Sequence, residues 1–204
     1  VEKELYKQYP LRAMNYYAEI TGIDSAMGML RTGLRDLDIA ENTVVWYTSD
    51  NGSRSPGSTG GLRGQKGTLY EGGIRVPLIA YWPGRVKAGS VNDHICAHWD
   101  LMPTFCELAK ISTPEHTDVI SYVPALTGGK QKEHDYLYWE FHSYGNAQAI
   151  RMGDWKAIRL KVKNDPDAPI QLYNLKQDIG ETKNIAATHP NVVKRIAPLF
   201  KEAH

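Results

Sequence analysis

The sequence has little of several features that would place it in a functional class at once. It contains only two cysteines, Cys96 and Cys106, whose spacing fits neither a disulfide framework nor a common metal-binding pattern. Its net charge is +1 with both signs interspersed, so it lacks the basic footprint that nucleic acids require, and we expect no nucleic-acid partner. It also lacks any apolar run close to the roughly 20 residues that cross a bilayer, so we expect no membrane span.

The apolar residues that are present indicate a layered α/β fold. Hydrophobic residues make up 42% of the chain, which is enough for a substantial core. Over residues 10–37 they recur in steps of three and four, as in an amphipathic helix packed on a sheet. The members of this stripe are Ile20, Ile23, Met27, Leu30, Leu34 and Leu37. A short connection then leads into the uncharged run Thr43–Thr48, which predicts a buried strand.

This predicted strand ends abruptly in a polar sequence that contains Asp50, Asn51 and Gly52. In open α/β sheets, ligands bind at the carboxyl ends of strands. The Asp50 carboxylate and the Asn51 amide carbonyl are hard oxygen donors that suit calcium or magnesium. Asp-Asn-Gly is also an excellent tight turn, so the spacing alone leaves both interpretations open.

The next stretch, residues 54–73, is rich in glycine, serine and threonine and predicts a long ordered loop with a functional role. It carries the cations Arg63 and Lys66 on backbone that can approach a ligand closely. A lysine beside a cation site suits an anionic tetrahedral group such as sulfate or phosphate. Glu71 and Arg75 are expected to form an ion pair that holds the loop.

The residues from Ser49 to Pro77 resemble the second signature region of the arylsulfatase-type sulfatases, a family within the alkaline phosphatase superfamily. Weaker matches follow in Asp100–Thr104, Gly153–Lys156 and Leu172–Leu175. The resemblance implies a sulfuric ester hydrolase in which Asp50 and Asn51 bind a calcium ion and Lys66 is a catalytic residue that contacts the sulfate. It also implies a sulfated glycan or an aryl sulfate as substrate, and an exported enzyme in the periplasm, the extracellular space or the lysosome.

One part of the family pattern is missing from this sequence. The family's nucleophile is a cysteine or serine within a C/S-x-P-S-R stretch, oxidised to formylglycine, and neither Cys96 nor Cys106 lies in such a stretch. The further aspartates of the family's metal site are missing too. The resemblance therefore implies that this chain is the C-terminal portion of a sulfatase. We expect the formylglycine in a missing N-terminal part of the same enzyme, and we expect this chain alone to be inactive.

We expect two structural units. Residues 1–132 would form the C-terminal part of an alkaline-phosphatase-like layered α/β domain, including a helix of about residues 100–110 with Asp100 as its N-cap. Residues 133–204 would form a small α+β subdomain, because short strand-like runs separated by turn residues predict an antiparallel meander. A helix over residues 190–202 would cover this small sheet, and Pro198 is expected to break it.

His142 is a weaker candidate for a substrate contact. It follows an aromatic strand, and an imidazole titrates near neutral pH, so it would suit a proton donor or hydrogen-bond partner. A histidine that simply fills an interface is the alternative.

Two other functions remain open from the residues alone. A phosphohydrolase of the same superfamily would use two transition metals and extra histidines. Asp50 and Asn51 have no neighbouring histidine, and an asparagine suits calcium better than zinc. A noncatalytic fragment or binding module is the second alternative.

Overall fold

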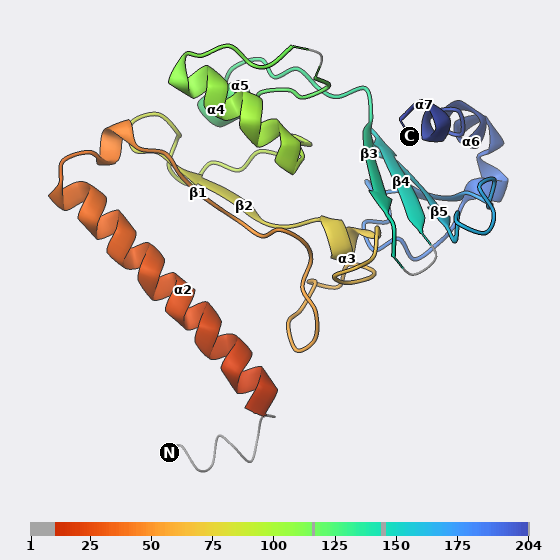
Figure 1. Cartoon of the computed structure of the whole chain (residues 1–204), viewed down its shortest axis with the longest axis horizontal. Helices are drawn as coiled ribbons and strands as arrows, with labels where there is room; N and C mark the ends of the chain where they lie inside the picture. Colours follow the sequence, from red (N-terminus) through yellow and green to blue (C-terminus); the bar gives the residue numbers. More distant parts are fainter. Residues whose placement is uncertain (1–10, 116, 144–145, 204) are drawn as a thin grey trace.

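The computed structural model describes residues 11–115, 117–143 and 146–203, and it contains a two-stranded and a four-stranded sheet joined by helices and long loops (Figure 1). The helices are α2 (Leu11–Asp36), α3 (Glu71–Ile74), α4 (Leu101–Ala109), α5 (Val123–Thr127), α6 (Pro190–Ile196) and α7 (Leu199–Glu202). The strands are β1 (Val45–Thr48), β2 (Leu78–Tyr81), β3 (Leu137–Phe141), β4 (Ala147–Met152), β5 (Trp155–Leu160) and β6 (Gln171–Asn174). Short 3-10 turns are η1 (Ala40–Asn42), η2 (His98–Asp100) and η3 (Ala186–Thr188). This combination of helices and small antiparallel sheets confirms the prediction that the chain has mixed α and β structure.

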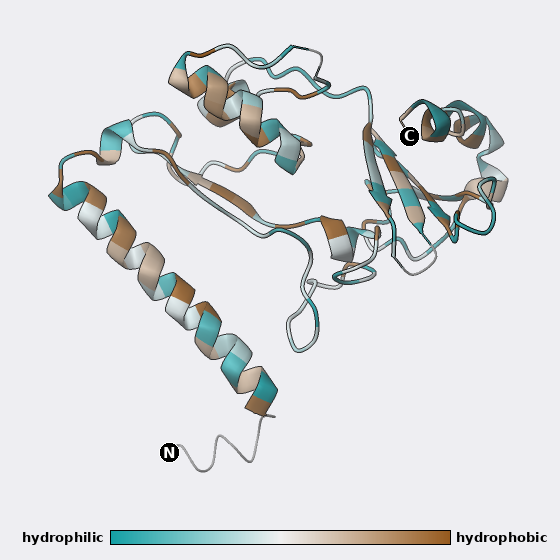
Figure 2. Cartoon of the chain, in the orientation of Figure 1, coloured by the Kyte–Doolittle hydropathy of each residue, from teal (hydrophilic) through white to brown (hydrophobic). Residues whose placement is uncertain are grey.

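The long helix α2 forms where the periodicity predicts it, but the expectation that its apolar stripe packs on a sheet of this chain is wrong. Ile23 is 49% exposed and Leu37 is 70% exposed. The helix contacts the rest of the chain through polar side chains: Arg12 donates to the carbonyl oxygen of Ser55, and Arg31 lies over the ring of Tyr81. Figure 2 shows hydrophobic residues along α2 interspersed with polar ones. In the described ranges, no helix is long and apolar enough to cross a bilayer.

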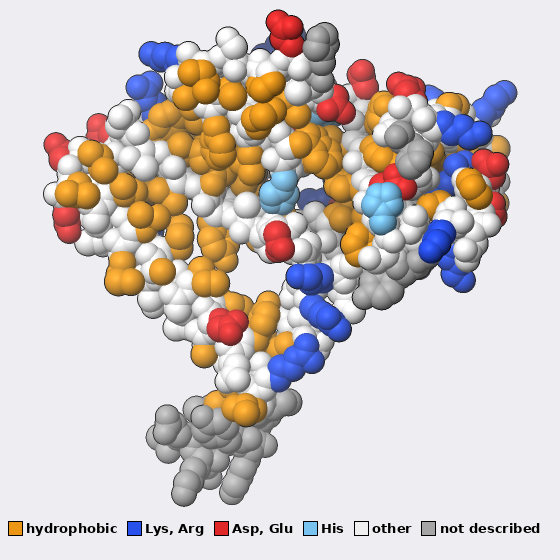
Figure 3. Space-filling view, viewed as in Figure 1, with side chains coloured by type: hydrophobic (Ala, Val, Ile, Leu, Met, Phe, Trp, Pro, Cys, Tyr) orange, Lys and Arg blue, Asp and Glu red, His pale blue; other side chains and the backbone are white. Residues whose placement is uncertain are grey.

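Strand β1 pairs with β2 in an antiparallel ladder. The sequence predicts instead that β1 is a buried strand within an open α/β sheet. Val45 lies opposite Tyr81 and Thr48 lies opposite Leu78. Both strands are only partly covered, with Ile79 57% exposed. Hydrophobic side chains therefore lie at the surface over this ladder and α4 (Figure 3).

The C-terminal sheet is the antiparallel meander that the sequence predicts, with strand order β3-β4-β5-β6. One face of it packs against α6 and α7, where Ile196 and Phe200 meet Ile150 and Leu172 in a buried cluster. The predicted break at Pro198 is confirmed, because α6 ends and α7 begins on either side of it. Proline lacks the amide hydrogen that would continue the helix.

The opposite face of this sheet is covered by the glycine-rich loop that follows β1. Leu69 is buried there together with Ile158 and Tyr173, and Tyr70 and Ile74 pack around them. In Figure 1, α3 lies beside the strands of the C-terminal sheet. A segment of the predicted first unit therefore forms part of the core of the second, and the boundary after residue 132 stays a prediction.

Asp100 precedes α4 as predicted, but its side chain does not cap that helix. Its backbone angles are already helical, φ −76° and ψ −11°, because it ends the turn η2. A side-chain cap needs extended angles at this position. The buried carboxylate instead accepts hydrogen bonds from the backbone N–H groups of Ala97 and Ile120, and lies 2.9 Å from Nε2 of His134. Asp100 thus links α4 to the segment that leads into β3.

We expect Phe200→Ala to destabilise the protein by about 3–5 kcal/mol, because the ring is almost fully buried between α7 and the sheet. Thermal unfolding followed by circular dichroism would measure the loss. Met29→Ala on α2 is the matched control, because Met29 is 71% exposed, and we expect little change there. Equal shifts for the two variants would contradict the packing of α7.

Candidate functional site

The candidate site lies where the end of β1 meets the loop that follows it. The backbone N–H of Gly52 donates to the carbonyl oxygen of Gly73 at 2.8 Å. The backbone N–H of Lys66 donates to the carbonyl oxygen of Ser53 at 3.1 Å. The first hydrogen bond joins the turn that carries Asp50 and Asn51 to α3, and the second joins it to the turn that carries Lys66.

Glycine is required for this close contact between two backbone segments. The N–H of Gly72 donates to the carbonyl oxygen of Arg63 at 2.7 Å, which folds the loop back on itself. A Cβ atom on Gly52 would overlap the carbonyl oxygen of Gly72, and one on Gly73 would overlap that of Thr68. The glycines of this region are therefore explained by packing of main chain against main chain.

The predicted ligands have side chains that are not committed to structural contacts. Asp50 is exposed, and its Oδ1 lies 3.5 Å from the Ser49 hydroxyl, a long hydrogen bond. Lys66 is exposed, and among the described residues no carboxylate pairs with its ammonium group. In the same part of the chain, no hydrogen bond engages the side-chain amide of the half-buried Asn51. Their roles in binding metal and sulfate stay predictions.

The chemistry of these donors fits a calcium ion, but their number is too small. Calcium takes six to eight oxygen ligands, and Asp50 and Asn51 supply carboxylate and amide oxygens of the right type. Over the described ranges, no group of three or more histidine, cysteine, aspartate or glutamate side chains is placed to hold a metal ion. A complete calcium site would need further donors from outside these residues.

The predicted ion pair of Glu71 and Arg75 is confirmed, with 3.4 Å between Arg75 Nη1 and Glu71 Oε2. Glu71 also has a second and closer partner, Lys156, which the sequence did not predict. Lys156 on β5 is fully buried and its Nζ donates to Glu71 Oε1 at 2.8 Å. The sequence offered one signal, because Lys156 shares its face of the strand with the buried Ile158, and a charge on an apolar face requires a buried partner.

A second buried carboxylate, Glu181, completes this group. Its Oε2 accepts the backbone N–H of Glu71 at 2.6 Å, and its Oε1 lies 3.0 Å from Lys156 Nζ. The second contact is an ion pair rather than a hydrogen bond, since Oε1 has no hydrogen-bond partner within the described residues. Burial raises the pKa of Glu181, and the charge of Lys156 and the N–H of Glu71 act in the opposite direction.

Arg63 is used within the fold. Its guanidinium lies 4.1 Å from the centre of the Tyr70 ring. The same group donates to the hydroxyl of Tyr173 at 2.9 Å and to the backbone oxygen of Glu181 at 2.8 Å. The charge of Arg63 is thus engaged within the fold, whereas that of Lys66 is left for a ligand.

His142 lies just after β3, and its side chain is 74% exposed. Its nearest charged group is Glu140, with 3.9 Å between His142 Nδ1 and Glu140 Oε1. Alternation along β3 puts Glu140 on the face that packs against α6 and α7, since its neighbour Tyr138 packs there, and His142 lies near Glu140. The structure therefore does not place His142 beside the Lys66 loop, and its contact with substrate stays a prediction.

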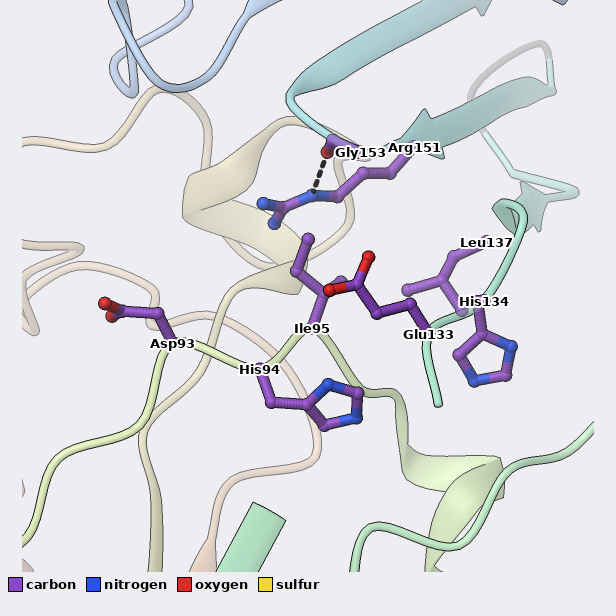
Figure 4. A pocket seen from close by; sticks show the side chains of 8 residues that line it. All are labelled: Asp93, His94, Ile95, Glu133, His134, Leu137, Arg151 and Gly153. Carbon is purple, nitrogen blue, oxygen red and sulfur yellow. Dashed lines mark hydrogen bonds between the residues drawn. The ribbon is translucent and has the colours of Figure 1, made fainter. Parts of the chain in front are cut away.

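A small pocket lies beside this site, between the segment before η2 and the end of β4 (Figure 4). It is lined by Asp93, His94, Ile95, Glu133, His134, Leu137, Arg151 and Gly153. Burial lowers the pKa of His94, although Asp100 opposes this shift. Arg151 donates through Nε to the carbonyl oxygen of Gly153 and lies 4.0 Å from Glu71, so its charge is shared with the buried carboxylate.

Comparison with known proteins gives matches over almost the whole chain. The family model described as "Sulfatase" matches residues 6–111. The family model for the C-terminal part of N-sulphoglucosamine sulphohydrolase matches residues 64–202. The two matches overlap on the loop that carries Lys66.

Individual sulfatases are similar to this chain in sequence and in structure. Human arylsulfatase A is 31% identical over 235 residues, which cover 95% of this chain and 46% of that protein. The solved structure of Ps i-CgsB in complex with k-i-k-neocarrahexaose has a TM-score of 0.80 at 29% identity, covering 90% of this chain and 41% of the other. BT4656, solved with its substrate D-glucosamine-2-N,6-O-disulfate, has a TM-score of 0.73 at 25% identity, covering 90% and 38%. The chain spans less than half the length of each of these proteins.

We expect Gly52→Ala to destabilise the site by about 1–3 kcal/mol, because the added methyl group would overlap the backbone of Gly72. Gly28→Ala in α2 is the matched control. A Cβ there meets nothing within 4 Å, so we expect a neutral or slightly stabilising effect of about 0.5–1 kcal/mol. Chemical denaturation of both variants would measure the difference, and a stable Gly52→Ala protein would contradict the contact between the turn at Gly52 and α3.

Proposed function

The chain belongs to the sulfatase family, and from this premise we propose that it supplies part of the metal and sulfate site of a sulfuric ester hydrolase. One observation carries the proposal. The hydrogen bond from the backbone N–H of Lys66 to the carbonyl oxygen of Ser53 holds a turn with two oxygen donors beside a turn with one uncommitted ammonium group. A hard cation and an oxyanion would be bound together by such an arrangement.

In this proposal Lys66 donates to the sulfate group and stabilises the negative charge that grows on its oxygens as the ester bond breaks. Fixed positive charge at that place is often the largest contribution to catalysis. Asp50 and Asn51 would hold calcium, which supplies further positive charge beside the sulfate oxygens when bound. The nucleophile, a formylglycine, would come from a part of the enzyme outside this chain.

We also propose that the remainder of the same enzyme covers the apolar surface of α2 and of the β1–β2 ladder. Large apolar side chains are exposed on both elements, including Ile23 and Ile79. Contiguous exposed apolar surface on a globular protein marks an interface. A chain that spans less than half of its relatives would leave such a surface uncovered. Alone, this chain would then be inactive.

A sulfated glycan is the substrate class that we favour over an aryl sulfate. Support comes from the similar protein BT4656, whose solved complex contains a disulfated glucosamine as its substrate. We further propose that the enzyme is exported, to the periplasm, the extracellular space or the lysosome.

We expect Lys66→Ala in the intact enzyme to lower kcat on a chromogenic sulfate ester by roughly 10²–10³-fold, because one fixed positive charge at the sulfate is lost. Lys163→Ala is the control, since Lys163 is exposed in the turn after β5, and we expect its rate to be unchanged. Circular dichroism would show that both variants are folded. Full activity of Lys66→Ala would contradict the assignment.

We expect removal of divalent ions with EGTA to abolish hydrolysis, and addition of calcium to restore it, because carboxylate and amide oxygens favour a hard cation. Elemental analysis of the intact enzyme would identify the bound metal. One calcium per molecule is the expected result. Two zinc ions per molecule would instead favour a phosphohydrolase.

A further inference from the structure

Lys156 is a fully buried charge that the proposed mechanism does not use. Its side chain is 0% exposed on β5. Removing an ammonium group from water is strongly unfavourable unless carboxylates compensate it. Two carboxylates do so here, Glu71 from the loop and Glu181 from the segment after β6. Both are also nearly fully buried, at 2% and 0% exposure.

Glu181 holds both ends of residues 63–71, the part of the loop that carries Lys66. Its backbone oxygen accepts the guanidinium of Arg63 at 2.8 Å, where the loop begins to fold back. Its carboxylate accepts the backbone N–H of Glu71 at 2.6 Å, where the loop enters α3. Lys156 then bridges the two carboxylates. The base of the loop is thus fixed to the C-terminal sheet at two points, eight residues apart in sequence.

The segment between these two points has little freedom. The N–H of Gly72 donates to the carbonyl oxygen of Arg63 at 2.7 Å and closes the loop. The N–H of Thr68 donates to the carbonyl oxygen of Gln65 at 3.0 Å and forms the turn that contains Lys66. A displacement of Glu71 would therefore move this turn and the hydrogen bond from Lys66 to Ser53.

We propose that Lys156 is a positioning residue, which sets the place of the Lys66 ammonium group through Glu71 and Glu181. An apolar side chain could fill the same space, but it would not fix the direction of the Glu71 carboxylate or hold it against Glu181. Arg75 and Arg151 contact the other oxygen of Glu71, so the charge of Lys156 acts on one defined side of that carboxylate. The inference rests on the proposed role of Lys66 in binding sulfate.

Hydrogen exchange of the 204-residue chain tests the positioning without any assay of function. We expect the Lys156→Met variant to exchange the amides of Lys66 and Gly72 at least tenfold faster than the wild type, because the base of the loop is released. The amide hydrogens within the β4–β5 ladder should keep their protection. Lys163→Met is the control with an exposed lysine, and we expect no change.

A second variant guards against a general loss of fold. Lys156→Met combined with Glu181→Gln removes one charge of each sign, and the new amide oxygen can still accept the N–H of Glu71. We expect the same local increase in exchange. Wild-type exchange at Lys66 in a folded double variant would overturn the proposal. Equal loss of protection across β4 and β5 would also overturn it, since Lys156 would then support the whole sheet.

Kinetics of the intact enzyme separate positioning from stability. We expect Lys156→Met to lower kcat/KM for a sulfate ester at least tenfold, and to have no further effect in a Lys66→Ala background. A structural role would give additive losses instead, which would overturn the proposal. If the wild-type enzyme hydrolyses no sulfate ester but Lys156→Met still frees the loop, the proposed function fails and the physical link between Lys156 and the loop stands.

Discussion

The buried ammonium group of Lys156 between two carboxylates is the interaction on which the arrangement of this chain depends. Glu71 belongs to the loop after β1, Lys156 to the C-terminal sheet, and Glu181 to the segment after β6. Leaving any one of these charges without its partners in the interior would be strongly unfavourable. The three segments are therefore required to meet at one place. In sequence, Lys156 lies 85 residues after Glu71 and Glu181 lies 110 residues after it.

This requirement explains why the C-terminal sheet has two different coverings. The helices α6 and α7 cover one face with apolar side chains such as Phe200, whose contacts are not directional. The loop covers the other face with Leu69 and Tyr70 around the ionic group, and there each contact is directional. The family model for the C-terminal part begins at residue 64, within this loop and well before the sheet itself. The loop thus forms part of the core of the sheet, and it also borders the turn at Asp50.

Local patterns predicted the elements well and the long-range contacts poorly. The antiparallel meander and the break at Pro198 follow from turn residues between short strand-like runs and from the chemistry of proline, both of which act over a few residues. Glu181 lies in a polar turn with no periodicity, so nothing local marks it as a partner of Lys156. For Asp100 a local pattern was present, but it was ambiguous. An acidic residue before a helix has the same sequence pattern whether it caps that helix or, as here, binds His134. For the site, resemblance indicated Asp50, Asn51 and Lys66, whereas only the structure showed that backbone hydrogen bonds hold their turns together.

The exposed apolar surface has a direct bearing on where the remaining ligands must lie. Burial of a large apolar side chain contributes about 1.5–3 kcal/mol, and α2 and the β1–β2 ladder leave several such side chains exposed. Strand β1 runs directly into the turn at Asp50, so any layer that covers this strand also ends beside that turn. Oxygen donors brought by such a layer would lie near Asp50 and Asn51, where they would add to the ligands of a calcium ion. Under the proposed function, the surface that completes the hydrophobic core and the surface that completes the metal site are therefore one and the same.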